Sequence, residues 1–141
     1  FDLITPNERE ARFSLGDQDS VIRPLALNLY KAANAKHLLL KMGERGLIGY
    51  RATEDIGHNT RAFFSIDSFA DTVVDAVGAG DALLAYATLT HLTSGNEVLA
   101  AIIGAMAAAV ECAKDGNIPV KPEDVLGLLD GMESRFSTDM N

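Results

Sequence analysis

The chain has 141 residues, of which 48% are hydrophobic and 23% are charged, a balance typical of one globular unit with a sizeable core. Twenty acidic residues against twelve basic ones give a net charge of −8, which argues against nucleic acid or an anionic membrane as a partner. The single cysteine, Cys112, excludes an internal disulfide and favours a reducing, cytoplasmic compartment.

The chain opens on an apolar stretch, Phe1 to Ile4, that is typical of the end of a strand. No initiator methionine, signal peptide or transit segment stands before it, so we expect a piece of a longer protein. No repeat, low-complexity tract or linker divides the sequence. Residues 1–131 are therefore predicted to form one unit, followed by a polar tail at 132–141.

A helix is predicted directly after the opening strand. Thr5, Pro6 and Glu8 have the spacing of a helix cap, a first-turn proline and a capping-box partner. This hypothesis accounts for three residues but gives no role to Asn7 and Glu10, which are three positions apart on one face of the expected helix.

The middle of the chain predicts one helix and several strands. Apolar residues recur at helical spacing in the first of these segments, and compact apolar runs follow, with Gly43 and Gly46 as turn residues of a hairpin. The expected elements are a helix over 20–34, a strand over 37–41, a strand ending at Tyr50 and a strand over 61–66.

Three histidines are scattered along the chain. His37, His58 and His91 have no second His or Cys at ligand spacing. Ordinary packing or solvent exposure is therefore favoured over metal binding through histidine.

Residues 72–84 carry the most informative pattern, a β-branched run, two glycines one residue apart, and an apolar segment, which together predict a strand, a tight loop and a helix. Glycines let the N–H groups of Gly78, Ala79 and Gly80 turn toward one point at a helix N-terminus, which forms an anion-binding site. Asp81 stands at the same helix start, beside the place where a phosphoryl group would be held.

Simpler explanations of this loop exist. Such turns occur in α/β proteins without a ligand, and an aspartate in the first helical turn also serves as a cap. Two nucleotide motifs do not fit: the dinucleotide pattern needs a glycine where Leu83 stands, and the P-loop needs a Gly-Lys-Ser/Thr triplet.

Three helices are expected in the last part of the chain. The helix after Asp81 has apolar residues around most of its circumference and is predicted to be buried. The next starts at Asn96 as its cap and runs to Lys114, with Gly116 as a left-handed residue after it. An amphipathic helix begins at Pro122.

The glycine loop resembles the second signature of the ribokinase-like carbohydrate kinases, the PfkB family, in which the order is Asp-Thr-x-Gly-Ala-Gly-Asp. Ala76 stands where the family usually has threonine. The resemblance implies an α/β, three-layer ribokinase-like fold with a mostly parallel sheet flanked by helices, and it covers the chain but only about the second half of such a kinase. The matching residues are Asp75, Gly78, Ala79, Gly80 and Asp81.

The resemblance also implies roles for single residues. Asp81 would be the catalytic base toward a sugar hydroxyl, and the Gly78 to Gly80 amides would hold the charge of the transferring phosphate. Asn7 and Glu10 match an Asn-x-x-Glu element near Mg²⁺ and the nucleotide phosphates, with Mg²⁺ held through water. Ala105 replaces an asparagine of the adenine pocket. The other cofactor-binding residues implied are Lys41, Gly43, Gly46, Asp75 and Gly116.

The implied function is phosphoryl transfer from MgATP to a sugar hydroxyl, with a monovalent cation as a further cofactor. The stretches at 4–8 and 40–46 resemble those of kinases that act on heptose phosphates or keto-deoxy sugar acids. The implied partners are the sugar substrate, the missing amino-terminal half and a second copy in a homodimer. Without the amino-terminal half, this piece would be inactive. A non-catalytic nucleotide-binding or assembly module is the alternative, supported by Ala76 and Ala105, and a dinucleotide-dependent oxidoreductase is a third.

Overall fold

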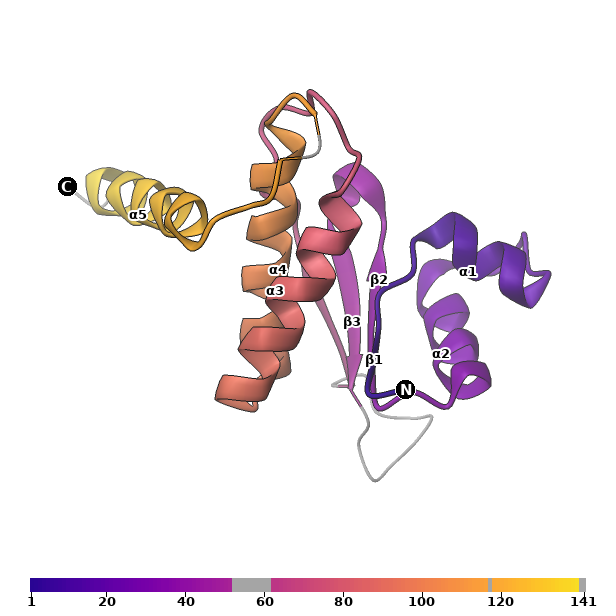
Figure 1. Ribbon diagram of the computed structural model, residues 1–141. Coiled ribbons are helices and arrows are strands. Elements are labelled where there is room, and N and C mark those ends of the chain that lie inside the picture. The colour runs from indigo at the N-terminus through magenta and orange to yellow at the C-terminus, as the bar shows by residue number, and fades with distance from the viewer. Residues whose placement is uncertain (52–61, 117, 140–141) are drawn as a thin grey trace.

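The computed structural model describes residues 1–51, 62–116 and 118–139 (Figure 1). One sheet lies between the helix pair α1 and α2 on one face and the helix pair α3 and α4 on the other, and α5 packs beyond α4. The strands are β1 (Leu3–Ile4), β2 (His37–Lys41), β3 (Leu47–Arg51) and β4 (Phe63–Ile66). The helices are α1 (Glu8–Leu15), α2 (Ile22–Ala33), the 3₁₀ turn η1 (Gly43–Arg45), α3 (Ala79–Ser94), α4 (Glu97–Cys112) and α5 (Pro122–Asp139).

The described strands follow the order β1-β2-β3-β4. β1 pairs with β2 in parallel, with Leu3 opposite His37, while β2–β3 and β3–β4 are antiparallel. The layered α/β architecture and the predicted hairpin are therefore confirmed, and the expected predominance of parallel pairing is not found among these strands, since the sheet is mixed. The antiparallel share is large because η1 reverses the chain directly from β2 into β3.

Helices on both faces of the sheet explain why β2 is apolar at successive positions. Leu38 and Leu40 point toward α1 and α2, whereas Leu39 packs against α3 and α4. All three leucines are less than 5% exposed. A strand that faces water on one side would alternate apolar and polar residues instead.

The α3–α4 contact is unusually close because it is made at a glycine. A Cβ on Gly104 would lie 2.9 Å from the carbonyl oxygen of Leu83 and 3.0 Å from the Cβ of Ala87. The expected burial of all of α3 is wrong, because only Leu83 and Ala87 are buried and Leu92 is 75% exposed. Apolar residues around a helix are buried only where another element packs against them, and no described element covers the outer face of α3.

The amino-terminal cap of α1 also differs from the prediction. The cap is Asn7, with Glu10 as its capping-box partner, so the Thr5–Pro6–Glu8 assignment is wrong. The reason is that the carbonyl oxygen of Pro6 accepts a hydrogen bond from the N–H of Lys41 at 2.9 Å, which holds this segment beside the end of β2, so the helix begins after Asn7.

The other helices agree with the sequence except at their ends. Asn96 caps α4, as predicted, and accepts from the N–H groups of Val98 and Leu99. α4 ends at Cys112, and α5 continues to Asp139, through most of the segment expected to be a polar tail. None of the helices in the described ranges has the length and apolar character that a membrane crossing requires.

Two histidines that are far apart in the sequence meet at the opposite end of the sheet from the glycine loop. The rings of His37 and His91 are 4.5 Å apart between centroids in an edge-to-face arrangement, and Nδ1 of His37 is 3.7 Å from a carboxylate oxygen of Glu97. That Nδ1 is buried and has no hydrogen-bond partner among the described residues. Burial first, and the charge of His91 second, lower the pKa of His37 below 6.5, against the opposing carboxylates of Glu97 and Asp2.

We expect Gly104→Val to lower the free energy of unfolding by about 1–3 kcal/mol, because the added side chain cannot fit against α3 without moving it. Urea unfolding measures the change. Gly127→Val is the matched control, since a Cβ at Gly127 of α5 meets nothing within 4 Å. Equal unfolding midpoints for the two variants would contradict the tight α3–α4 contact.

Stability is expected to fall as pH is lowered from 7.5 to 5.5. Because the pKa of His37 is lower in the folded chain than its unfolded value of 6.5, the unfolded state binds more protons in this window. The contribution is thus fully present above pH 6.5 and is lost as pH falls toward the folded pKa. His37→Gln should show a smaller loss of the urea midpoint over this range, and an unchanged slope would contradict this assignment.

Candidate functional site

The candidate site begins at the carboxyl end of β2. Lys41 is the last residue of this strand, and it forms an isolated parallel bridge with Asn7 in addition to its hydrogen bond with Pro6. Since Asn7 is the cap of α1, the strand end and the helix start are fixed to one another through their backbones.

A reciprocal pair of hydrogen bonds closes the amino-terminal end of α1. The side-chain oxygen of Asn7 accepts from the N–H of Glu10 at 2.8 Å, and the Glu10 carboxylate accepts from the N–H of Asn7 at 2.7 Å. The Asn-x-x-Glu spacing that we assigned to metal binding therefore has a complete structural role as a capping box.

The glycine loop forms the start of α3 but does not follow a strand. Gly78 is the N-cap, with φ 87°, a conformation that favours glycine, and it has no side-chain cap. The N–H groups of Val74 and Asp75 donate to the carbonyl oxygen of Cys112 at 2.8 and 3.2 Å, so this segment is tied to the end of α4. The predicted strand at 72–75 is therefore wrong. Asp75 shapes the turn by accepting from the N–H of Val77 at 2.9 Å.

Lys41 joins the two helix starts. A Cβ on Gly80 would lie 2.8 Å from Nζ of Lys41, so the ammonium group rests against the first turn of α3 and would have to shift if a side chain were added there. The amino-terminal ends of α1 and α3 both carry partial positive charge. A lysine and two helix starts thus gather positive charge at one end of the sheet, which is an arrangement suited to phosphate.

Asp81 stands in the same first turn of α3. It is exposed, and no ion pair joins it to another residue in the described ranges. Its carboxylate is therefore accessible to a substrate hydroxyl beside the loop.

The remaining predicted residues lie in different surroundings. Gly43 and Gly46, with φ 62° and 78°, shape the turn that follows Lys41. Gly116 also has positive φ, 81°, and lies four residues beyond the end of α4. Ala105 packs against the core cluster between the sheet and the α3–α4 pair, about 10 Å along α4 from Cys112. Its contacts are those of a packing residue.

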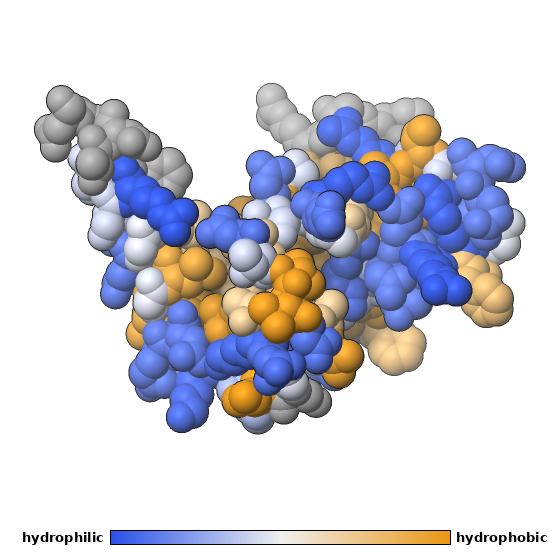
Figure 2. Space-filling model, turned by 90° about the horizontal axis from the view of Figure 1, so that it is seen from above, coloured by the Kyte–Doolittle hydropathy of each residue, from blue (hydrophilic) through white to orange (hydrophobic). Residues whose placement is uncertain are grey.

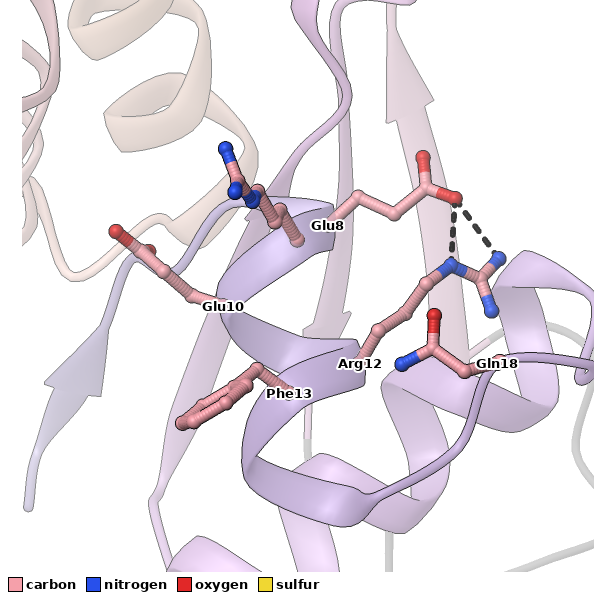
Figure 3. Close-up of a pocket in the computed structure, with 6 residues that line it drawn as sticks. Glu8, Glu10, Arg12, Phe13 and Gln18 are labelled. Carbon is pink, nitrogen blue, oxygen red and sulfur yellow. Dashed lines mark hydrogen bonds and ion pairs between the residues drawn. The ribbon is translucent and has the colours of Figure 1, made fainter.

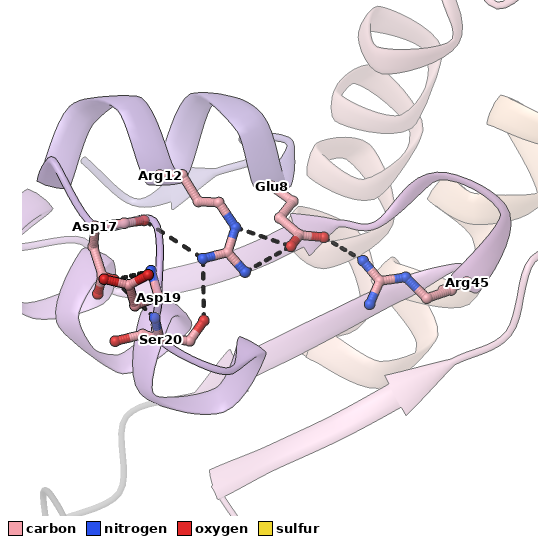
Figure 4. Close-up of polar contacts among 6 residues, drawn as sticks. All are labelled: Glu8, Arg12, Asp17, Asp19, Ser20 and Arg45. Carbon is pink, nitrogen blue, oxygen red and sulfur yellow. Dashed lines mark hydrogen bonds and ion pairs between the residues drawn. The ribbon is translucent and has the colours of Figure 1, made fainter.

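A carboxylate that the sequence analysis assigned only to a cap connects α1 with the turn after β2. One oxygen of Glu8 accepts from Nε and Nη2 of Arg12 at 3.0 and 2.8 Å, and the other pairs with Arg45 (Figure 4). These contacts, with the Arg12 hydrogen bond first, lower the pKa of Glu8. The Glu8–Arg12 spacing of four residues is visible in the sequence, but the Arg45 contact is not.

A groove of about 500 Å³ runs along the outer side of α1 (Figure 3). It shares Glu10 with the predicted site, but Lys41, Gly80 and Asp81 do not line it, so we do not assign the chemistry to it. Its lining residues are Glu8, Arg9, Glu10, Arg12, Phe13 and Gln18.

Apolar side chains flank the glycine loop. Val73, Val74 and Val77 are each more than half exposed. Figure 2, which looks onto the molecule from above, shows hydrophobic surface set among hydrophilic side chains.

In the described ranges, no three His, Cys, Asp or Glu side chains are grouped so as to hold a metal ion directly. Glu10 is exposed, and one of its oxygens accepts from Asn7. The other oxygen can accept a hydrogen bond from a metal-bound water, which is how Mg²⁺ is usually met in phosphate sites.

The fold is a layered α/β architecture, and the positive charge gathered at the two helix starts suits a phosphate group. The chain belongs to the pfkB family of carbohydrate kinases, whose family model matches residues 1–123. The predicted family and the ribokinase-like fold are thereby confirmed.

Two proteins named bifunctional protein HldE are similar to this chain. The one from Pelobacter propionicus is 29% identical over 129 residues, and the one from Geobacter metallireducens is 30% identical over 129 residues. The alignments cover 88% and 89% of this chain but 25% of each relative. The chain thus spans about a quarter of the length of these relatives.

Solved structures of sugar kinases share the fold. Ribokinase from Thermotoga maritima has a TM-score of 0.76 at 24% identity and is matched over 92% of this chain and 42% of its own. Phosphofructokinase-2 from Escherichia coli, in complex with potassium, has a TM-score of 0.77 at 17% identity, over 94% of this chain and 41% of its own. Ribokinase from Arabidopsis thaliana, complexed with ribose and ATP, has a TM-score of 0.74 at 23% identity, over 92% and 41%.

Gly80→Ala tests the contact between Lys41 and the first turn of α3. The added Cβ would displace the ammonium group while improving helix propensity, so we expect unchanged or slightly higher stability and a several-fold weaker affinity for tripolyphosphate. Isothermal titration calorimetry measures the affinity. Gly131→Ala, in the open part of α5, is the control, and equal affinities in both variants would contradict the assigned position of Lys41.

Proposed function

We propose that this chain is the nucleotide-binding, catalytic part of an ATP-dependent carbohydrate kinase. The observation that carries the proposal is made at the first turn of α3, where the Lys41 ammonium group lies against Gly80 and the carboxylate of Asp81 is exposed. Membership in the pfkB family supports a sugar hydroxyl as the acceptor.

In this mechanism the terminal phosphate of ATP lies over the start of α3. The N–H groups of Gly78, Ala79 and Gly80 stabilise the charge that its equatorial oxygens carry in a loose transition state. Asp81 orients the sugar hydroxyl in line with the bond that breaks and accepts its proton late in the transfer. ADP leaves, and the sugar phosphate carries the transferred group.

The remaining groups hold the nucleotide. Lys41 binds its phosphates from the end of β2, and the Gly43–Gly46 turn and the loop at Asp75 border it. Mg²⁺ would neutralise phosphate charge when bound, and Asn7 and Glu10 would hold it through water. ATP and potassium in complexes of the similar kinases support ATP and a monovalent cation as cofactors here. Gly116 would border the base from the loop after α4.

The sugar site would be completed by a partner. The matched kinase structures are more than twice as long as the region that this chain covers, which supports an amino-terminal half as the partner. The acceptor class that we propose is a heptose phosphate or a keto-deoxy sugar acid, and the assembled kinase could pair with a second copy. The net charge of −8 argues against nucleic acid or an anionic membrane as a partner, and the single cysteine, Cys112, supports a cytoplasmic location.

A non-catalytic nucleotide-binding or assembly module is the second candidate. The observation in its favour is Ala76, which lacks the hydroxyl that the kinase signature has at this position. The pfkB family match does not support the dinucleotide-dependent oxidoreductase.

Asp81→Asn separates the two candidates. In the protein that carries both halves, we expect phosphoryl transfer from MgATP to the sugar to fall between about 100-fold and 10,000-fold, because the asparagine cannot accept the proton. Nucleotide affinity should change little, since the amide keeps the size of the side chain. Steady-state turnover and calorimetry with ATP measure the two effects.

The control is Asp115→Asn, in the exposed segment after α4, which should leave turnover unchanged. Turnover that survives Asp81→Asn would contradict the role of Asp81 and favour a binding module.

A further inference from the structure

Glu8 holds two arginines with one carboxylate, but it does not hold them equally. Arg12 donates two hydrogen bonds to one oxygen and is further fixed by the carbonyl oxygen of Ser20 at 3.1 Å. Its side chain is 21% exposed. Arg45 reaches only the other carboxylate oxygen, and its side chain is 63% exposed. Among the described residues, Glu8 is the one side chain with which Arg45 pairs.

The Glu8–Arg45 pair can therefore open at little cost. The Arg45 end of the pair is 63% exposed, so water can solvate the guanidinium group when it leaves, and Glu8 would keep both hydrogen bonds from Arg12. No buried charge would be left without a partner, which is the condition that makes broken ion pairs expensive.

Arg45 also stands in the right place to serve the phosphate site. It is four residues after Lys41, in the turn that is closed by a hydrogen bond from the N–H of Met42 to the carbonyl oxygen of Gly46 at 2.8 Å. Its guanidinium group is attached to the residue next to Asn7, the cap of α1 (Figure 4). Lys41 at the end of β2 and Arg45 in the turn that follows thus border the same end of the sheet.

We propose that Arg45 is an exchangeable phosphate-binding residue that rests on Glu8 in the empty site and moves to the terminal phosphate when a polyphosphate binds. This inference rests on the proposed function and adds one residue to its site. A guanidinium group binds phosphate oxygens in a bidentate manner, and a phosphate carries more charge than the carboxylate that it replaces. No bond is made or broken in the exchange.

The exchange predicts opposite effects for the two members of the pair. Arg45→Gln should weaken the affinity for tripolyphosphate and for MgATP about tenfold, because a charge-assisted contact is lost. Glu8→Gln should strengthen both a few-fold, because it removes the competitor of the phosphate while its amide oxygen still accepts from Arg12. In the Arg45→Gln background, Glu8→Gln should bring no such gain. Calorimetry at fixed ionic strength measures all four proteins.

Glu44→Gln is the matched control for net charge. Glu44 is exposed in the same turn, so its replacement removes one negative charge without touching the pair. Its effect on affinity should be smaller than that of Glu8→Gln. An equal effect would mean that the gain comes from charge alone and would overturn the proposal.

A measurement on the unmodified chain guards against variants that do not fold. In a titration with tripolyphosphate followed by nuclear magnetic resonance, the side-chain Nε–H signal of Arg45 should shift, while that of Arg12 should stay. An Arg45 signal that does not shift would overturn the proposal. Equal losses of affinity in Glu8→Gln and Arg45→Gln would also overturn it, because they would show that the ion pair has only a structural role. If the chain binds tripolyphosphate but not MgATP, the kinase function is overturned, and the role of Arg45 is decided by the tripolyphosphate affinities alone. If the chain binds neither compound, both the kinase function and the role of Arg45 are overturned.

Discussion

The close approach of α3 and α4 is the constraint on which the rest of this structure depends. Because Gly104 has no side chain, its backbone lies directly against the carbonyl oxygen of Leu83 and the Cβ of Ala87. This contact fixes the position of α3 relative to α4. The carbonyl oxygen of Cys112 then holds the segment before α3 by two hydrogen bonds. The position of the glycine loop is therefore set from α4, not from a strand that leads into it.

One parallel pair of strands is sufficient to build the other half of the site. β1 and β2 run in the same direction, so the residues that follow them, Asn7 and the end of β2 at Lys41, emerge at the same edge of the sheet. β3 runs the opposite way, whereas β4 runs in the same direction as β2, so its carboxyl end at Ile66 also lies at that edge, opposite Leu47. Binding sites of α/β proteins lie at the carboxyl ends of parallel strands for this reason.

Local patterns made most of the fold predictable. The hairpin at Gly43, the Asn96 cap and the helix after Gly78 each depend on neighbours within a few residues, and each was found where the sequence indicated. The cap of α1 was misplaced because Pro6 pairs with Lys41, a partner 35 positions away that local spacing cannot reveal. The strand before Asp75 was misread for the same reason, since β-branched residues favour strands only where a neighbouring strand is available.

The candidate site divides in the same way. The motif around Asp81 could be read from glycine spacing and from the resemblance that it carries. The contact of Lys41 with Gly80 and the attachment of Arg45 to Glu8 could not, because each joins elements that the sequence keeps far apart. A sequence shows which groups have the chemistry, and the tertiary fold decides which of them meet.

The way Cys112 is placed gives this chain a built-in reporter position. It is the single cysteine of a protein without tryptophan, and its backbone carbonyl holds the loop segment at Val74 and Asp75. Burial, with the nearby charges of Glu111 and Asp75, raises the pKa of the thiol, so labelling reagents will attack it slowly and selectively at alkaline pH. A fluorophore attached there would emit against a dark background and sense each displacement of the loop beneath it.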